Sequence, residues 1–147
     1  MPLTGGCQCG NIKYAVDGDP VGNALCYSAS CRHSTGSANT ASFLVLKRLF
    51  KSSGTPKVYT RKSSSGADVQ NSSCGDCGSP LWVNAASLDE SGLIIIRPVT
   101  LSDLILNETF KPQMEIYCRS KYSWESDIED AQKFETMMPH QQEIPAV

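Results

Sequence analysis

Short runs in which apolar and polar residues alternate recur along the chain and predict β-strands. In 11–16 the apolar side chains of Ile12, Tyr14 and Val16 fall on alternate positions, which is typical of a strand with one buried face. The most apolar run, 93–96, lies between a glycine and a proline and predicts a central strand. The same reasoning places further strands at 41–46, 57–60, 80–83 and 115–118.

Helical signals are few. The segment 26–36 predicts one short helix, because Ser28 or Ser30 is suited to cap its start and Gly36 to end it. A capping-box pattern predicts a second short helix at 126–134. Six or seven short strands with so little helix predict an all-β fold built from small coiled antiparallel sheets.

The length and charge of the chain narrow the class of protein. A chain of 147 residues has the size of one domain, which we place at 1–138, followed by a loose polar tail at 139–147. The net charge of −2 and the isoelectric point near 5.6 give no basic surface for nucleic acid or an anionic membrane. No apolar run is long enough to span a bilayer. The first residues do not resemble a secretion signal.

Cysteine usage points to a metal site. The chain has seven cysteines, and an odd number without a secretion signal predicts reduced thiols in the cytoplasm. Two close pairs stand out, Cys7 with Cys9 and Cys74 with Cys77, and each pair is followed by a glycine suited to a tight turn. Together they offer the four thiolates of a structural zinc site shielded from solvent. The alternatives are two disulfides or four unrelated buried thiols.

The order of these motifs resembles the glutathione-dependent formaldehyde-activating enzyme (GFA) family, which also includes centromere protein V. The resemblance covers roughly residues 3–138 and implies a zinc-bound fold of coiled antiparallel sheets, with Cys7, Cys9, Cys74 and Cys77 as ligands of a structural zinc. Such family members are associated with a second, catalytic zinc and with lyase activity that forms or cleaves S-(hydroxymethyl)glutathione. The matching motifs are Gly6-Cys7-Gln8-Cys9-Gly10, Cys31-Arg32-x-x-Thr35-Gly36-Ser37 after Cys26, Cys74-Gly75-Asp76-Cys77-Gly78-Ser79-Pro80-Leu81, and Ser120-Lys121 with Trp124.

The sequence departs from the family pattern at the catalytic Cys-x-Cys-x-x-Cys triad, whose positions are Cys26, Ser28 and Cys31. A serine hydroxyl is a much poorer zinc ligand than a thiolate. Three hypotheses follow for the second zinc. It is lost, or it is held weakly by the two remaining thiols with another group completing the shell, or Cys118 or His33 takes the place of the missing sulfur.

Other residues have both a structural and a functional interpretation. Arg32 is suited to bind a substrate carboxylate or to form a salt bridge with a loop. His33 is either a solvated surface residue or a general acid or base. Cys118 is expected to be a small core residue on the strand 115–118, and Trp82 and Trp124 are expected in the core.

These observations predict a zinc-containing GFA-like enzyme with carbon–sulfur lyase-type or related chemistry. Its substrate would be a small electrophile or thiol adduct, such as a glutathione adduct, and the candidate catalytic residues are Cys26, Ser28, Cys31, Arg32 and His33. One alternative is a zinc-stabilised binding module without catalysis. Another is an enzyme that works without a second metal, through a free cysteine or through Arg32 and His33.

Overall fold

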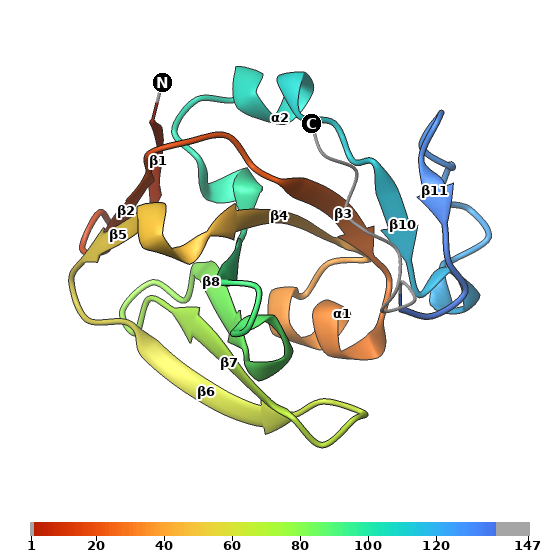
Figure 1. Cartoon of the computed structure of the whole chain (residues 1–147), viewed down its shortest axis with the longest axis horizontal. Helices are drawn as coiled ribbons and strands as arrows, with labels where there is room; N and C mark the ends of the chain where they lie inside the picture. Colours follow the sequence, from red (N-terminus) through yellow and green to blue (C-terminus); the bar gives the residue numbers. More distant parts are fainter. Residues whose placement is uncertain (1, 138–147) are drawn as a thin grey trace.

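The computed structural model of the chain describes residues 2–137, in which the strands form two sheets (Figure 1). The small sheet has the strand order β1-β2-β5, and the large one has the order β11-β10-β3-β4-β9-β8-β7-β6. The predicted tail at 139–147 lies outside the described residues. The strands are β1 (Leu3–Gly6), β2 (Lys13–Val16), β3 (Gly22–Cys26), β4 (Thr40–Leu46), β5 (Phe50–Ser53), β6 (Lys57–Lys62), β7 (Asp68–Ser73), β8 (Pro80–Ala85), β9 (Leu93–Ile96), β10 (Met114–Ile116) and β11 (Gln132–Lys133).

Helical segments are short and connect or cover the sheets. The α-helices are α1 (Ala29–Thr35) and α2 (Ile105–Thr109), and the 3-10 segments are η1 (Lys47–Leu49), η2 (Ala86–Leu88), η3 (Pro98–Thr100) and η4 (Cys118–Ser120). The all-β prediction is therefore confirmed. Within residues 2–137, no helix has the length and apolar character needed to cross a membrane.

The main core lies where the two sheets face each other. Tyr14 and Val16 of β2 are buried, whereas Lys13 at the start of this strand is exposed, as the alternating pattern predicts. From the large sheet, Trp82 and Ile96 pack into the same cluster. Full burial of one such apolar side chain contributes about 1.5–3 kcal/mol, so this cluster fixes the position of the small sheet on the large one.

The C-terminal part of the fold differs from the sequence prediction. Strand β10 pairs in parallel with both β3 and β11, although every other strand pairing is antiparallel within the described residues. The helix predicted at 126–134 is wrong, since part of this segment is β11. The amide groups of Gln132 and Phe134 donate to the carbonyls of Gln113 and Glu115, so pairing with β10 overrides the local helix signal.

Two single-residue predictions in this region are also wrong. Trp124 does not enter the core: it is 71% exposed and stacks on Tyr122 with the ring planes 7° apart. Cys118 does not lie on a strand, because β10 ends at Ile116 and Cys118 begins η4. The prediction that Trp82 is a core residue is confirmed.

Candidate metal centre and thiol site

Two turns of similar geometry bring the predicted zinc ligands together. Cys7 and Cys9 follow β1, and the amide of Gly10 donates to the carbonyl of Cys7 at 3.1 Å. Cys74 and Cys77 follow β7, and the amide of Gly78 donates to the carbonyl of Cys74 at 2.9 Å. Gly10 and Gly78 both have a positive φ, 81° and 78°, a backbone conformation that residues with a Cβ rarely adopt.

The four sulfur atoms of these cysteines fit a tetrahedral metal ion. The Sγ of Cys9 lies 3.6 Å from the Sγ of Cys7 and 3.6 Å from the Sγ of Cys74, and all four ligand atoms lie within 4.8 Å of one another. With Zn–S bonds of about 2.3 Å, the sulfurs of a tetrahedral site are about 3.8 Å apart. This four-cysteine cluster, made of Cys7, Cys9, Cys74 and Cys77, can therefore bind a metal such as zinc. It is not shielded on all sides, because Cys9 is exposed.

Hydrogen bonds to the sulfurs of Cys7 and Cys77 favour the thiolate form that a metal requires. The amide of Ile12 donates to the Sγ of Cys7 at 3.2 Å. The Ser79 side chain lies 3.3 Å from the Sγ of Cys77, and hydrogen bonds from the hydroxyl and amide of Ser79 lower the pKa of Cys77 to about 5. Such surrounding donors orient metal ligands and stabilise their charge.

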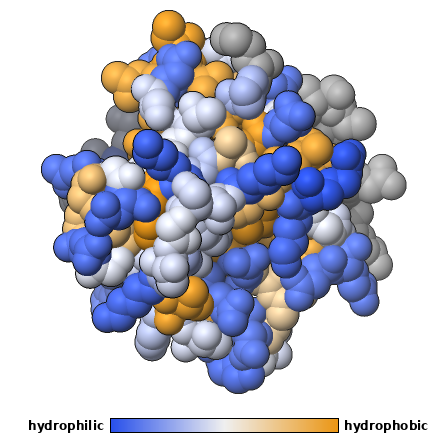
Figure 2. Space-filling model, turned by 90° about the vertical axis from the view of Figure 1, so that its left-hand side faces the viewer, coloured by the Kyte–Doolittle hydropathy of each residue, from blue (hydrophilic) through white to orange (hydrophobic). Residues whose placement is uncertain are grey.

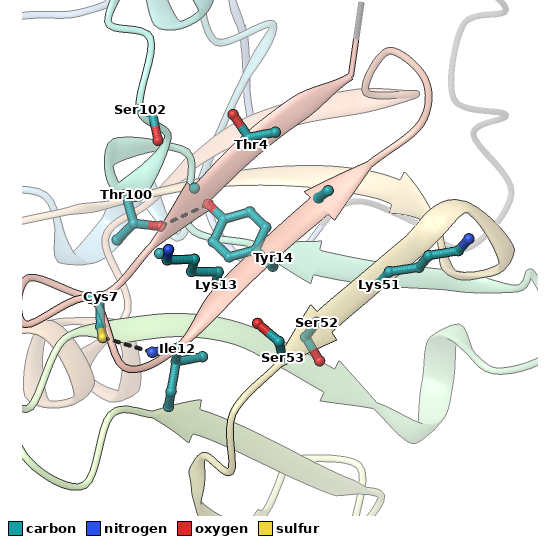
Figure 3. Close-up of a pocket in the computed structure, with 14 residues that line it drawn as sticks. Thr4, Cys7, Ile12, Lys13, Tyr14, Lys51, Ser52, Ser53, Thr100 and Ser102 are labelled. Carbon is teal, nitrogen blue, oxygen red and sulfur yellow. Dashed lines mark hydrogen bonds between the residues drawn. The ribbon is translucent and has the colours of Figure 1, made fainter.

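A hollow in the surface adjoins this cluster but not the second thiol site. It has a volume of about 690 Å³ and lies over the small sheet, with Cys7 at one end and the Tyr14–Thr100 hydrogen bond along one side (Figure 3). On the face of the molecule shown in Figure 2, the apolar residues form separate small groups with hydrophilic residues between them. Cys26 and Cys31 do not line the hollow.

The three triad positions meet where β3 ends and α1 begins. Cys26 is the last residue of β3, Ser28 is the N-cap of α1, and Cys31 lies in the first turn. The Ser28 hydroxyl accepts from the Cys31 amide at 3.2 Å and from the Cys26 thiol at 3.2 Å. One of the two caps proposed from the sequence, Ser28, is thus confirmed, and so is the helix end at Gly36, which has a φ of 68°.

The donor set at this second site does not fit a catalytic zinc. The Ser28 oxygen already accepts two hydrogen bonds, and no third cysteine, histidine or carboxylate groups with Cys26 and Cys31 in the described part of the chain. Cys118, proposed as a substitute ligand, donates its thiol to the carbonyl of Glu115 at 3.4 Å. Two thiols without a third charged ligand are a poor zinc site.

The two thiols nonetheless differ in chemical character. The Cys26 thiol, the Ser28 hydroxyl and the positive charges of Arg97 and Arg61 together lower the pKa of Cys31 to about 6. The neighbouring Cys31 and burial raise the pKa of Cys26. The two shifts are opposite in direction, so negative charge is favoured at Cys31 over Cys26.

Arg32 and His33 lie on α1 but are placed differently. The Arg32 guanidinium donates to the carbonyls of Tyr27 and Ser120 and lies over the Tyr122 ring, 5.3 Å from its centre. It therefore ties α1 to η4. His33 is exposed. Catalytic roles for these two residues stay predictions.

Sequence reasoning missed Arg97, which directly follows β9. Arg97 is 6% exposed, and its guanidinium donates to the Ser42 hydroxyl at 2.8 Å. Its positive charge interacts with Cys31 and helps to lower the pKa of that thiol. The signal was present, because a charged residue between an apolar strand and a proline at 98 is unusual unless it has a buried partner.

The fold and the cysteine cluster define a small β-sheet protein with four thiols arranged to hold a metal such as zinc. The chain belongs to the GFA family: the family model described as glutathione-dependent formaldehyde-activating enzyme matches residues 2–120. The matched span contains the four-cysteine cluster, both thiols of the second site and Arg97. No curated protein matches the chain in sequence.

Proposed function

We propose that this GFA-family protein is an enzyme that makes or breaks a carbon–sulfur bond at Cys31, on a small electrophile or a thiol adduct such as a glutathione adduct. The observation that carries the proposal is the environment of Cys31: it lies in the first turn of α1 next to Ser28, which binds the Cys26 thiol, and it interacts with the buried Arg97. A thiolate held next to a positive charge is the form of cysteine that attacks carbon.

The roles of the two thiols follow from their opposite pKa shifts. The Cys31 sulfur attacks an electrophilic carbonyl carbon and forms a C–S bond, while the carbonyl π electrons move to the oxygen. The protonated Cys26 thiol gives its proton to that oxygen, and the same proton returns when the adduct breaks down. The Ser28 hydroxyl accepts from the Cys26 thiol and from the backbone amide of Cys31, and so holds the two residues next to each other.

The four-cysteine cluster has a structural role in this proposal. A zinc ion held by four protein thiolates has no open position for substrate, so it supplies stability rather than catalysis. The cluster joins the turn after β1 to the turn after β7, and thereby connects the small sheet to the large one. The chemistry at Cys31 does not pass through this ion.

Alkylation by iodoacetamide is expected to show that Cys31 is a thiolate at neutral pH. Because the pKa of Cys31 is lowered to about 6, its reaction rate should rise as the pH increases through about 6 and be level above about pH 7. Cys118 is the internal control, since burial raises its pKa and its rate should still be rising above pH 8. Mass spectrometry of the cysteine-containing peptides measures both rates in one sample.

The control variant is Cys31→Ser, which should lose the fast phase and keep the slow one. A Cys31 rate that rises only near pH 9, like that of an ordinary thiol, would contradict the proposal and favour the binding module without catalysis.

Replacing Ser28 with cysteine is expected to create a second metal site. The change Ser28→Cys adds a third thiol beside Cys26 and Cys31, and three thiolates with one open position are typical of a catalytic zinc. The zinc content should rise from near one to near two per chain. Elemental analysis of both proteins after identical zinc exposure and desalting measures this change.

Ser28→Ala is the matched control for the lost helix cap. It should cost about 1 kcal/mol of stability and leave the zinc content near one. A zinc content near two per chain in the unchanged protein would show that Cys26, Cys31 and Ser28 already bind a second ion. That result would contradict the conclusion that these three residues do not fit a catalytic zinc.

A further inference from the structure

Two arginines near Cys31 lack an acidic partner. In residues 2–137 the ion pairs all involve lysine, and neither Arg97 nor Arg61 forms one. Arg97 is buried, and the Nε of Arg61 is a buried donor with no hydrogen-bond partner. Buried charges in proteins are ordinarily paired, because removing an unpaired charge from water is costly.

The Cys31 thiolate can balance only part of this charge. Arg97 and Arg61 both act electrostatically on Cys31 and repel each other. If Cys31 is ionised, one negative charge faces two positive ones, and a net charge of about one remains. If Cys31 is protonated, the excess is larger. In either state the site attracts a further anionic group.

A cavity that Arg97 helps to line has space for such a group. Its volume is about 180 Å³, and it lies between α1 and the strands β6, β7 and β8. Arg97 lines it, and so does Tyr59, which shares a face of β6 with Arg61 because residues two apart in a strand point the same way. Ser34 and Asn71 add uncharged polar side chains to the wall.

We propose that Arg97 and Arg61 bind an anionic group of the substrate, such as a carboxylate, in this cavity beside Cys31. The proposal rests on the proposed function in one respect, namely that Cys31 is the group that reacts. Arginine is suited to this task because its planar donors match the two oxygens of a carboxylate. The substrate class is then an electrophile or thiol adduct that carries a negative charge, held so that its reactive carbon faces Cys31.

Paired alkylating reagents test this inference in the intact protein. Iodoacetate and iodoacetamide both transfer a two-carbon group to sulfur and release iodide, but only iodoacetate carries a carboxylate. The iodoacetate-to-iodoacetamide rate ratio at Cys31, divided by the same ratio for free glutathione, reports anion binding separately from thiol reactivity. We expect this normalised ratio to be about tenfold or more above one, since a charged hydrogen bond contributes at least that factor.

Substitutions identify the residues responsible. Arg61→Gln and Arg97→Gln should each bring the normalised ratio toward one, and Arg97 is the more disruptive change because it is buried. Arg48→Gln is the matched control, because Arg48 is exposed in η1, and it should leave the ratio unchanged. A ratio that neither Arg61→Gln nor Arg97→Gln alters would overturn the assignment.

Competition distinguishes the source of the anion. Acetate should slow iodoacetate at Cys31 and leave iodoacetamide unaffected, which would support a small anionic substrate. Protection by S-methylglutathione at lower concentration than acetate would place a glutathione carboxylate in the site. Fast reaction with iodoacetamide and no preference for iodoacetate would overturn the anion site while leaving Cys31 as the nucleophile. Slow reaction with both reagents would overturn the inference and the proposed function together.

Discussion

Cys9→Ala is expected to lower the melting temperature of the protein by more than about 10 °C, although Cys9 lies on the surface. Exposed side chains away from special features usually change stability very little when they are replaced. Cys9, however, contacts the sulfurs of both Cys7 and Cys74, so its loss opens the metal site. Structural zinc contributes on the order of 10 kcal/mol in small sites, comparable to the whole net stability of a domain.

Calorimetry and zinc analysis of the purified variant measure this effect. Cys118→Ala is the matched control, because Cys118 lies outside the four-cysteine cluster, and it should keep its zinc and melt within a few degrees of the unchanged protein. Chelation of the unchanged protein should lower its melting temperature as far as Cys9→Ala does. A metal-free protein that melts at the same temperature as the zinc-loaded one would refute a structural role for the cluster.

Glu115→Gln is expected to lower the free energy of unfolding by about 3 kcal/mol at pH 7. The Glu115 side chain is fully buried on β10, and its carboxylate accepts from the Tyr27 hydroxyl at 2.5 Å and from the Lys121 amine at 2.9 Å. The Lys121 side chain is itself only 9% exposed. The Lys121 amine also pairs with Asp127, but that carboxylate is 67% exposed. Removing the charge of Glu115 therefore leaves the ammonium group without its buried counter-charge, which is the costly way to break a buried ion pair.

The pH dependence of this effect has a definite sign. Burial opposes ionisation of Glu115, but hydrogen bonds from Tyr27 and Lys121 outweigh it, so the pKa of Glu115 is lowered in the folded state. A lowered carboxyl pKa stabilises the fold above the unfolded value of about 4.3, and this stability is lost as the pH falls through the folded pKa. The difference between the two proteins should therefore shrink in acid.

Urea unfolding at pH 7 and at pH 3 measures both parts of this prediction. Glu135→Gln provides the control, because Glu135 is an exposed carboxylate on the same C-terminal segment, and its effect should be below about 0.5 kcal/mol. A loss for Glu115→Gln that is equally small at pH 7 would mean that the buried carboxylate is not ionised.

The parts of the protein that depend on neighbours in the sequence were predictable. The cysteine pairs Cys7–Cys9 and Cys74–Cys77 and the glycines after them specify two turns through local backbone geometry, and the structure confirms both. The alternation at 11–16 specified a half-buried strand for the same reason, because side-chain direction in a strand repeats every two residues. Ser28 and Gly36 likewise set the limits of α1.

Only the tertiary structure decided the features that join distant segments. The capping-box pattern at 126–134 predicted a helix, but this segment pairs with β10 instead. Its backbone amides donate to the carbonyls of Gln113 and Glu115. Nothing near Arg97 in the sequence shows that it would lie beside Cys31, because β9 and α1 are far apart along the chain. The sequence by itself determined the four cysteines of the cluster, which can hold a metal, and the serine at position 28 in place of a third thiol. The charge around Cys31, and with it the predicted substrate class, was decided by the packing of strands onto one another, since electrostatic interactions depend on distance in space.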